Sequence, residues 1–178
     1  NIKYMQDSEG GDRQQYGLPY NQAKVISELK KVNPNLAVIL ISGNAVEMPW
    51  LADAKAVLQA WYLGSDAGYA IADIISGDAN PSGKLPFTFP VKLEDNAAIS
   101  FGKLSYPGDS INVDYKEGIL VGYRWHDTKK IKPQFAFGYG LSYTSFSISN
   151  VKCDKKEYKA GEKIKISCQV NNTGNLAG

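Results

Sequence analysis

The chain has few of the residues that most often build metal centres and nucleophilic triads. Its 178 residues include one histidine, His126, and two cysteines, Cys153 and Cys168. Two cysteines are too few for a four-cysteine zinc site, and any Ser-His-Asp triad would have to use His126. We expect that histidine on the surface or in a loop, near the end of a strand. The cysteines could form one disulfide, although Cys168 shares the apolar face of its segment, which favours a free, buried thiol.

An excess of charge of one sign is missing, and so are long apolar runs. The 20 basic and 18 acidic side chains give a formal net charge of +2. No Lys/Arg cluster is long enough to predict a nucleic-acid-binding surface. No run approaches the roughly 18 consecutive apolar residues of a membrane span. We therefore expect neither nucleic acid nor a membrane as a partner. No signal peptide opens the sequence, which carries no information on export because the sequence begins abruptly.

Helix-like and strand-like segments alternate over the first half of the chain. Apolar residues at helical spacing mark one face of a helix at 21–32, which Asn33-Pro34 ends. The run at 36–41 is continuously apolar and rich in branched residues, which predicts a strand buried on both faces of a sheet. The elements that follow are expected to be a short helix at 49–54, a strand at 56–62, a helix at 67–75 and a short strand at 84–89. This order predicts an α/β fold in which the central strands are parallel.

The second half of the chain has a different pattern. Residues 91–140 show little periodicity but contain many Gly, Pro, Asp, Asn and aromatic residues. This composition predicts a long, ordered segment that wraps the surface. From Ser142 onward, and again over 164–170, apolar residues alternate with polar ones, which predicts the opening strands of a β-sandwich. The sequence holds far fewer strands than the roughly seven that such a sandwich needs.

Two loops after the predicted strands carry acidic residues where α/β sheets often bind ligands. Glu47 follows the strand at 36–41, and we expect it to cap a helix or form a salt bridge within the domain. The glycine-rich loop at 64–68 could imitate a phosphate cradle. It lacks the Lys-Ser/Thr pair of a P-loop and the spacing of a dinucleotide fingerprint, and Asp66 would repel an anion. A nucleotide-binding domain is therefore disfavoured.

Four stretches together resemble the C-terminal half of glycoside hydrolase family 3, and they occur in the right order. They are DSEGGDR at 7–13, SGNAVEMPW at 42–50, GDANPSGKLPFTFP at 77–90, and VGYRW at 121–125 with FGYGLSYT at 137–144. The resemblance covers nearly the whole chain. It implies that residues 1–143 form a three-layer α/β sandwich, a mostly parallel sheet flanked by helices, incomplete at its N-terminus and including the irregular segment 91–140. It also implies that residues 144–178 begin a truncated, immunoglobulin-like β-sandwich of the fibronectin-type-III-like kind.

The resemblance also implies a catalytic residue. In this family a TIM-like barrel supplies an aspartate nucleophile, and the α/β sandwich after it supplies the general acid/base. The glutamate that matches the acid/base loop is Glu9, which precedes Gly10-Gly11-Asp12-Arg13. Retaining glycosidases need two carboxyl groups roughly 5 Å apart, and the two glycines let the backbone present Glu9 to another domain. Asp12 and Arg13 are supporting residues, expected to pair with each other or to orient the loop.

The activity implied is hydrolysis of terminal β-linked sugars with retention of configuration. A β-glucoside is the first choice of substrate and a β-xyloside the next, and no metal or organic cofactor is required. The barrel of the same protein is an implied partner, so the chain alone is expected to be inactive. Members of the family are commonly exported, which implies an extracytoplasmic location, periplasmic or secreted. The alternative is a non-catalytic carbohydrate-binding or scaffolding module.

Overall fold

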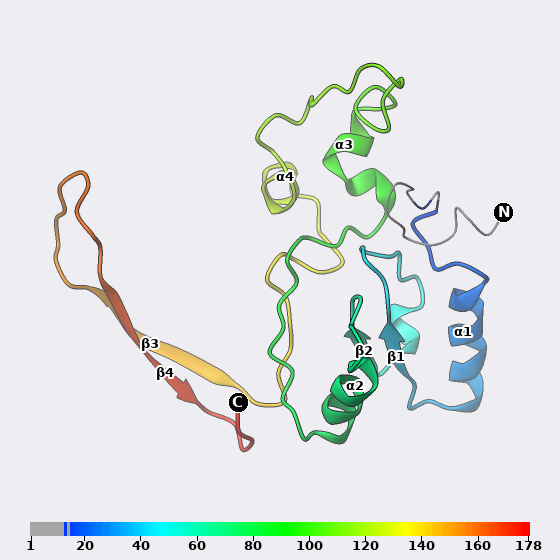
Figure 1. The fold of residues 1–178 in the computed structure, drawn as a ribbon, viewed down its shortest axis with the longest axis horizontal. Coiled ribbons are helices and arrows are strands. Elements are labelled where there is room, and N and C mark those ends of the chain that lie inside the picture. The colour runs from blue at the N-terminus through cyan, green and yellow to red at the C-terminus, as the bar shows by residue number, and fades with distance from the viewer. Residues whose placement is uncertain (1–12, 14) are drawn as a thin grey trace. The chain divides into compact units, whose positions relative to one another are not determined.

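The computed structural model describes residue 13 and residues 15–178 (Figure 1). The chain divides into two compact units. The first comprises the residues up to Gly68 together with Lys84–Tyr139, and the second comprises Tyr69–Gly83 and Gly140–Gly178. Over the described ranges, no helix combines the length and the apolar character needed to cross a bilayer. The fold is mixed α/β, with a small parallel sheet in the first unit and a two-stranded antiparallel sheet in the second.

The first unit is built on two parallel strands that lie side by side (Figure 1). Strand β1 (Ala37–Leu40) pairs with β2 (Ala56–Gln59), so the predicted parallel arrangement is confirmed. Helix α1 (Gln22–Val32) precedes β1, also as predicted. The helix expected at 49–54 is a single 3-10 turn, η2 (Leu51–Asp53), and the Ser27 hydroxyl of α1 donates to its Asp53 carboxylate at 2.9 Å.

Burial of β1 differs from the expectation. Only Leu40 of this strand is buried, while Ile39 is 38% exposed and the following Ile41 is 64% exposed. The prediction of a strand covered on both faces is therefore wrong for the described part of the chain. The physical reason is that the parallel sheet has two strands here, and a sheet of this size leaves part of an apolar run without neighbours.

The core of the first unit depends on the loop after β1 more than on the strands. The buried cluster contains seven residues, namely Ile26, Leu40, Ala45, Val46, Met48, Trp50 and Phe89. Four of the seven come from residues 45–50. Trp50, Phe89 and Val46 are each only 1% exposed. Because so many of its side chains are buried in the core, the conformation of this loop is fixed by packing.

Residues 85–89 run antiparallel to residues 135–139 and bring two of the conspicuous sequence stretches together (Figure 1). The Leu85 amide donates to the Tyr139 carbonyl at 2.9 Å, and the Phe89 amide donates to the Phe135 carbonyl at 2.8 Å. Only Phe89 and Phe135 form a β-bridge, so the strand predicted at 84–89 is not present. Pro86 has no N–H to donate, which interrupts the pairing between the two contacts.

The segment 91–140 is mostly irregular, as expected, but it holds three short helical elements. These are η3 (Leu93–Asp95), α3 (Ala97–Ser100) and α4 (Tyr123–Lys129). The prediction that His126 lies on the surface or in a loop is wrong, because this residue is in α4 and is 5% exposed. Its Nδ1 lies 3.1 Å from the Ile131 carbonyl oxygen. The inward orientation follows from a two-turn helix that the irregular sequence around it did not reveal.

The second unit contains most of α2 (Ala67–Ser76) and a hairpin of β3 (Phe146–Cys153) and β4 (Ile166–Asn172). The strands pair antiparallel, with an irregularity between Ser149 and Lys152. Asn80 ties the turn after α2 to the start of the hairpin, since its Oδ1 accepts from the Tyr143 amide at 2.8 Å and its side chain pairs with the Ser142 hydroxyl. The alternation in the sequence therefore predicted these strands correctly, although the structure has a two-stranded sheet and not a sandwich.

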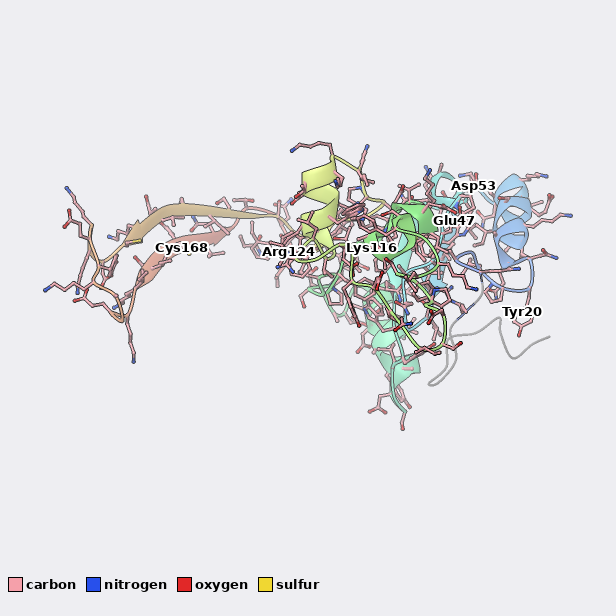
Figure 2. All side chains as sticks on the ribbon, turned by 90° about the horizontal axis from the view of Figure 1, so that it is seen from above. Tyr20, Glu47, Asp53, Lys116, Arg124 and Cys168 are labelled. Carbon is pink, nitrogen blue, oxygen red and sulfur yellow. The ribbon has the colours of Figure 1, made fainter. Side chains whose placement is uncertain are left out.

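The two cysteines lie on the hairpin and are both free and exposed; Cys168 is labelled on β4 in Figure 2. The interpretation as free thiols is confirmed, but the expected burial of Cys168 is wrong. Every residue of β4 is exposed, because a two-stranded sheet has no second layer to cover either face.

Candidate functional site

The predicted catalytic residues meet the described structure at Arg13. Glu9 and Asp12 lie outside the described residues, whereas Arg13 is described and partly buried. The site can therefore be built from Arg13 and from the residues that surround it at the carboxyl ends of β1 and β2. Open parallel sheets commonly bind ligands at these ends.

Arg13 is anchored on the loop after β1. Its Nη2 donates to the Ala45 carbonyl oxygen at 2.6 Å, across 32 positions of sequence. Ala45 and its neighbour Val46 are 7% and 1% exposed, so the acceptor is held in place by packing. A hydrogen bond from a charged donor of this kind contributes about 1.5–3 kcal/mol. This contact fixes Arg13, the residue that directly follows the predicted acid/base run, to a backbone carbonyl of the packed loop after β1.

A second polar contact joins the carboxyl ends of the two strands. The Gln59 Nε2 at the end of β2 donates to both the carbonyl and the hydroxyl oxygen of Ser42, each at 3.2 Å. The Ser42 hydroxyl in turn donates to the Asn44 carbonyl at 2.8 Å. Gly43 lies so close to the Tyr62 ring that an added Cβ would be 2.7 Å from its Cε2. A side chain at position 43 would therefore displace the ring, which explains why a glycine occupies it.

Glu47 lies in the same loop and points to a different role from the one expected. Figure 2 shows Glu47 and Asp53 on the connection between β1 and β2. The Glu47 backbone amide donates to the Tyr16 carbonyl at 3.0 Å. Within the described residues its carboxylate forms no salt bridge, so the expected ion pair is not found there. The carboxylate instead contributes negative potential around Tyr16.

Tyr16 was not predicted and is the most strongly perturbed titratable group described. Its hydroxyl donates to the Pro90 carbonyl at 2.8 Å, across 74 positions. Burial raises the pKa of the Tyr16 phenol far above its ordinary value of 10.0, the Arg13 charge partly opposes this, and Glu47 and Asp95 add to the rise. A lone tyrosine in a loop gives no periodic signal, so sequence reasoning could not have found this contact.

Tyr16→Phe is expected to destabilise the first unit by about 1–3 kcal/mol at neutral pH, because it leaves the buried Pro90 carbonyl without its donor. The raised pKa in the folded state means that the neutral phenol is favoured. Its contribution to stability is therefore complete below about pH 10 and is lost as the pH rises above that value. Urea unfolding at about pH 8 and about pH 11 should show a smaller alkaline loss in Tyr16→Phe than in the unsubstituted protein. Tyr20→Phe, at a 45% exposed tyrosine, is the control and should keep the full alkaline loss. An equal alkaline loss in both variants would contradict the assignment.

The arrangement is a polar, packed edge with a cation, an amide and a carboxylate near the carboxyl ends of parallel strands. In the part of the chain that the structure describes, no three His, Cys, Asp or Glu side chains gather to hold a metal ion. The described residues of this edge offer hydrogen bonds and the charges of Arg13 and Glu47.

Most of the chain matches the sequence profile of a known protein family. Residues 2–143 match the sequence profile of the glycosyl hydrolase family 3 C-terminal domain. The chain belongs to this family.

Individual relatives are β-glucosidases. The chain is 54% identical to β-glucosidase BoGH3A of Bacteroides ovatus over 178 residues. The aligned region is 100% of this chain and 24% of that protein. It is 46% identical over 172 residues to the thermostable β-glucosidase B of Acetivibrio thermocellus, covering 97% and 22%. The crystal structure of DesR, a β-glucosidase from Streptomyces venezuelae in complex with D-glucose, superposes with a TM-score of 0.86 at 43% identity, covering 93% of this chain and 21% of that one. The chain thus spans about a quarter of the length of the curated relatives it matches.

Proposed function

We propose that the chain is part of a retaining β-glycosidase, a β-glucosidase first, in which Glu9 is the general acid/base. The observation that carries this proposal is the identity of 54% over the whole chain with a β-glucosidase. The Ser-Glu-Gly-Gly-Asp-Arg run supports the residue assignment, because it ends at Arg13, whose guanidinium is bonded to the packed loop after β1. A loop anchored at one end can present a carboxyl group reproducibly while glycines shape the rest.

The proposed chemistry is a double displacement. Glu9 donates its proton to the departing glycosidic oxygen while an aspartate from the barrel of the complete protein attacks the anomeric carbon. Glu9, now a carboxylate, then takes a proton from the water that hydrolyses the glycosyl-enzyme. Both carboxyl groups must lie roughly 5 Å apart for this sequence of steps. The Arg13–Ala45 bond would anchor the residue that follows the Glu9–Asp12 run in the sequence, and Asp12 is proposed to support the acid/base.

The proposal extends to the architecture and setting of the complete protein. Several large apolar side chains are 64–77% exposed, among them Ile41, Tyr69 and Ile75. Such side chains are normally covered in a finished fold. We therefore propose that residues 1–143 are part of a three-layer α/β sandwich that further strands and helices of the complete protein fill out. The hairpin within 144–178 would be the start of a fibronectin-type-III-like sandwich. Carbohydrate is the proposed substrate, and an extracytoplasmic location, periplasmic or secreted, is proposed with it.

The test is the stereochemistry of hydrolysis by the complete protein. With 4-nitrophenyl β-D-glucoside, proton NMR during the first minutes should show β-D-glucose forming before mutarotation, because two inversions restore the configuration. The 178-residue chain assayed alone should release no nitrophenol. Initial formation of α-D-glucose would rule out the retaining mechanism. Sugar binding by the complete protein without any hydrolysis of β-glucosides or β-xylosides would support a non-catalytic module instead.

A further inference from the structure

A cavity of about 140 Å³ lies in the first unit, separate from the Arg13–Ala45 contact. Its wall is formed by the start of α3 with its N-cap, by α4 with its N-cap, and by four further residues, Thr88, Pro90, Glu117 and Val121. Both helices lie in the upper part of Figure 1. The indole Nε1 of Trp125 donates to the Asp95 carbonyl at 3.1 Å and so ties α4 to η3. Trp125 itself is 6% exposed. The cavity therefore has walls that are fixed by a hydrogen bond and by packing.

Two polar groups in the wall are buried without a hydrogen-bond partner. Thr88 is 8% exposed, and its hydroxyl is bonded to no group of the protein. The Oε2 of Glu117 is buried and is also without a partner. Leaving such groups unsatisfied is costly, so a buried donor or acceptor in a native site normally has a partner. Both residues line the same cavity, which points to a ligand that supplies the missing bonds.

The nearest cations in sequence do not satisfy Glu117. Lys116 is paired with Asp114 at 3.8 Å, and the Arg124 guanidinium lies over the Tyr123 ring at 5.7 Å. Figure 2 labels both cations. The Oε2 atom of Glu117, a residue that lines the cavity, therefore keeps its capacity to accept a hydrogen bond.

His126 adds a second acceptor. Its Nδ1 faces the Ile131 carbonyl, which can only accept, so Nδ1 carries the hydrogen. In the neutral imidazole Nε2 then has the lone pair, and the residue lines the cavity. Asn96 contributes hydrogen-bond donors to the wall. Its Oδ1 accepts from the Ala98 amide at 3.0 Å, so its side-chain NH₂ group is the part that can bond to a ligand. The cavity thus offers acceptors at Glu117 and His126, donors at Asn96, and a Thr88 hydroxyl that can do either.

We propose that this cavity binds a vicinal diol, presented by a small polyol or by the edge of a sugar ring. Two adjacent hydroxyl groups can each donate one hydrogen bond and accept another, which matches the two acceptors and the donors of the wall. At about 30 Å³ per water molecule the cavity has room for about four or five waters, which suits a three-carbon polyol. A metal ion fits less well, since the described residues gather no three His, Cys, Asp or Glu ligands. The site does not depend on Glu9 or on hydrolysis.

The test uses the complete protein with histidine labelled by ¹³C at Cε1, and the His126 signal is assigned by its loss in His126→Gln. Titration with glycerol should move this signal along a saturable curve with a Kd on the order of 10 mM, a weak affinity appropriate to so small a ligand. Propan-1-ol, which lacks the second hydroxyl, should not saturate. D-glucose distinguishes a sugar edge from a free polyol, because it should compete with glycerol only if the cavity admits a ring.

Thr88→Val and Glu117→Gln remove one polar contact each while nearly conserving shape, and each should weaken glycerol binding at least 10-fold. Glu94→Gln, at an exposed glutamate of η3 outside the cavity wall, is the matched control and should leave the curve unchanged. Two results would overturn the proposal. One is a linear, non-saturating shift that propan-1-ol reproduces, which would leave water as the occupant. The other is unchanged glycerol binding in both cavity variants, which would place the site elsewhere.

Discussion

Replacing Glu9 by Gln in the complete protein is expected to lower kcat for cellobiose by about 10²–10⁴-fold, the usual contribution of a positioned general acid. Cellobiose has a poor leaving group that must be protonated as the bond breaks. An aryl glycoside with a stable phenolate leaving group needs no proton, so its glycosylation step should be affected far less. The ratio of the two rates therefore reports on the acid itself and not on general damage to the protein.

The pH profile supplies an independent measurement. A general acid must be protonated in the free enzyme, so kcat/KM for cellobiose should fall as the pH rises through its pKa, and Glu9→Gln should lack that alkaline limb. Glu47→Gln is a suitable control, because Glu47 is a half-buried carboxylate on the loop that binds Arg13 and has no proposed proton-transfer role. Equal losses on cellobiose and on the aryl glycoside in Glu9→Gln would count against Glu9 as the acid. Unchanged activity would remove the assignment.

The secondary structure that could be predicted is the part that local pattern determines. Helix α1 and the parallel β1–β2 pair follow from apolar spacing and from the helix–strand order. The burial of β1 could not be predicted, because it depends on which other helices and strands pack against it. The sequence of the strand does not specify those elements. The same reason explains the exposed Cys168, whose alternating segment formed a strand as expected but has no covering layer among the described residues.

The sequence pattern could not predict the contacts of the site, because these contacts join residues that are far apart in the sequence. Arg13 meets Ala45 across 32 positions, and Tyr16 meets Pro90 across 74. The resemblance identified the stretches that contain these residues but not the atoms that bond. His126 was misjudged for a related reason, since the seven-residue helix α4 is too short to show clear periodicity in the sequence around it. Its position in the cavity wall became evident only with the fold.

Phe89→Ala is expected to produce the largest loss of stability, about 3–5 kcal/mol, as is usual when a fully buried aromatic ring is removed. Phe89 is 1% exposed, and its ring centroid lies 5.4 Å from that of Phe87 and 6.1 Å from that of Trp61. The cavity left by the substitution therefore cannot close unless these rings move. The substitution also bears on the site, because Pro90, whose carbonyl accepts from Tyr16, is the next residue. Urea unfolding of the complete protein, followed by tryptophan fluorescence, should therefore show a transition shifted to lower urea. Phe137→Ala, at a 54% exposed ring, should cost only about 1 kcal/mol, and a loss as small as this at Phe89 would mean that the ring is not part of a tightly packed core.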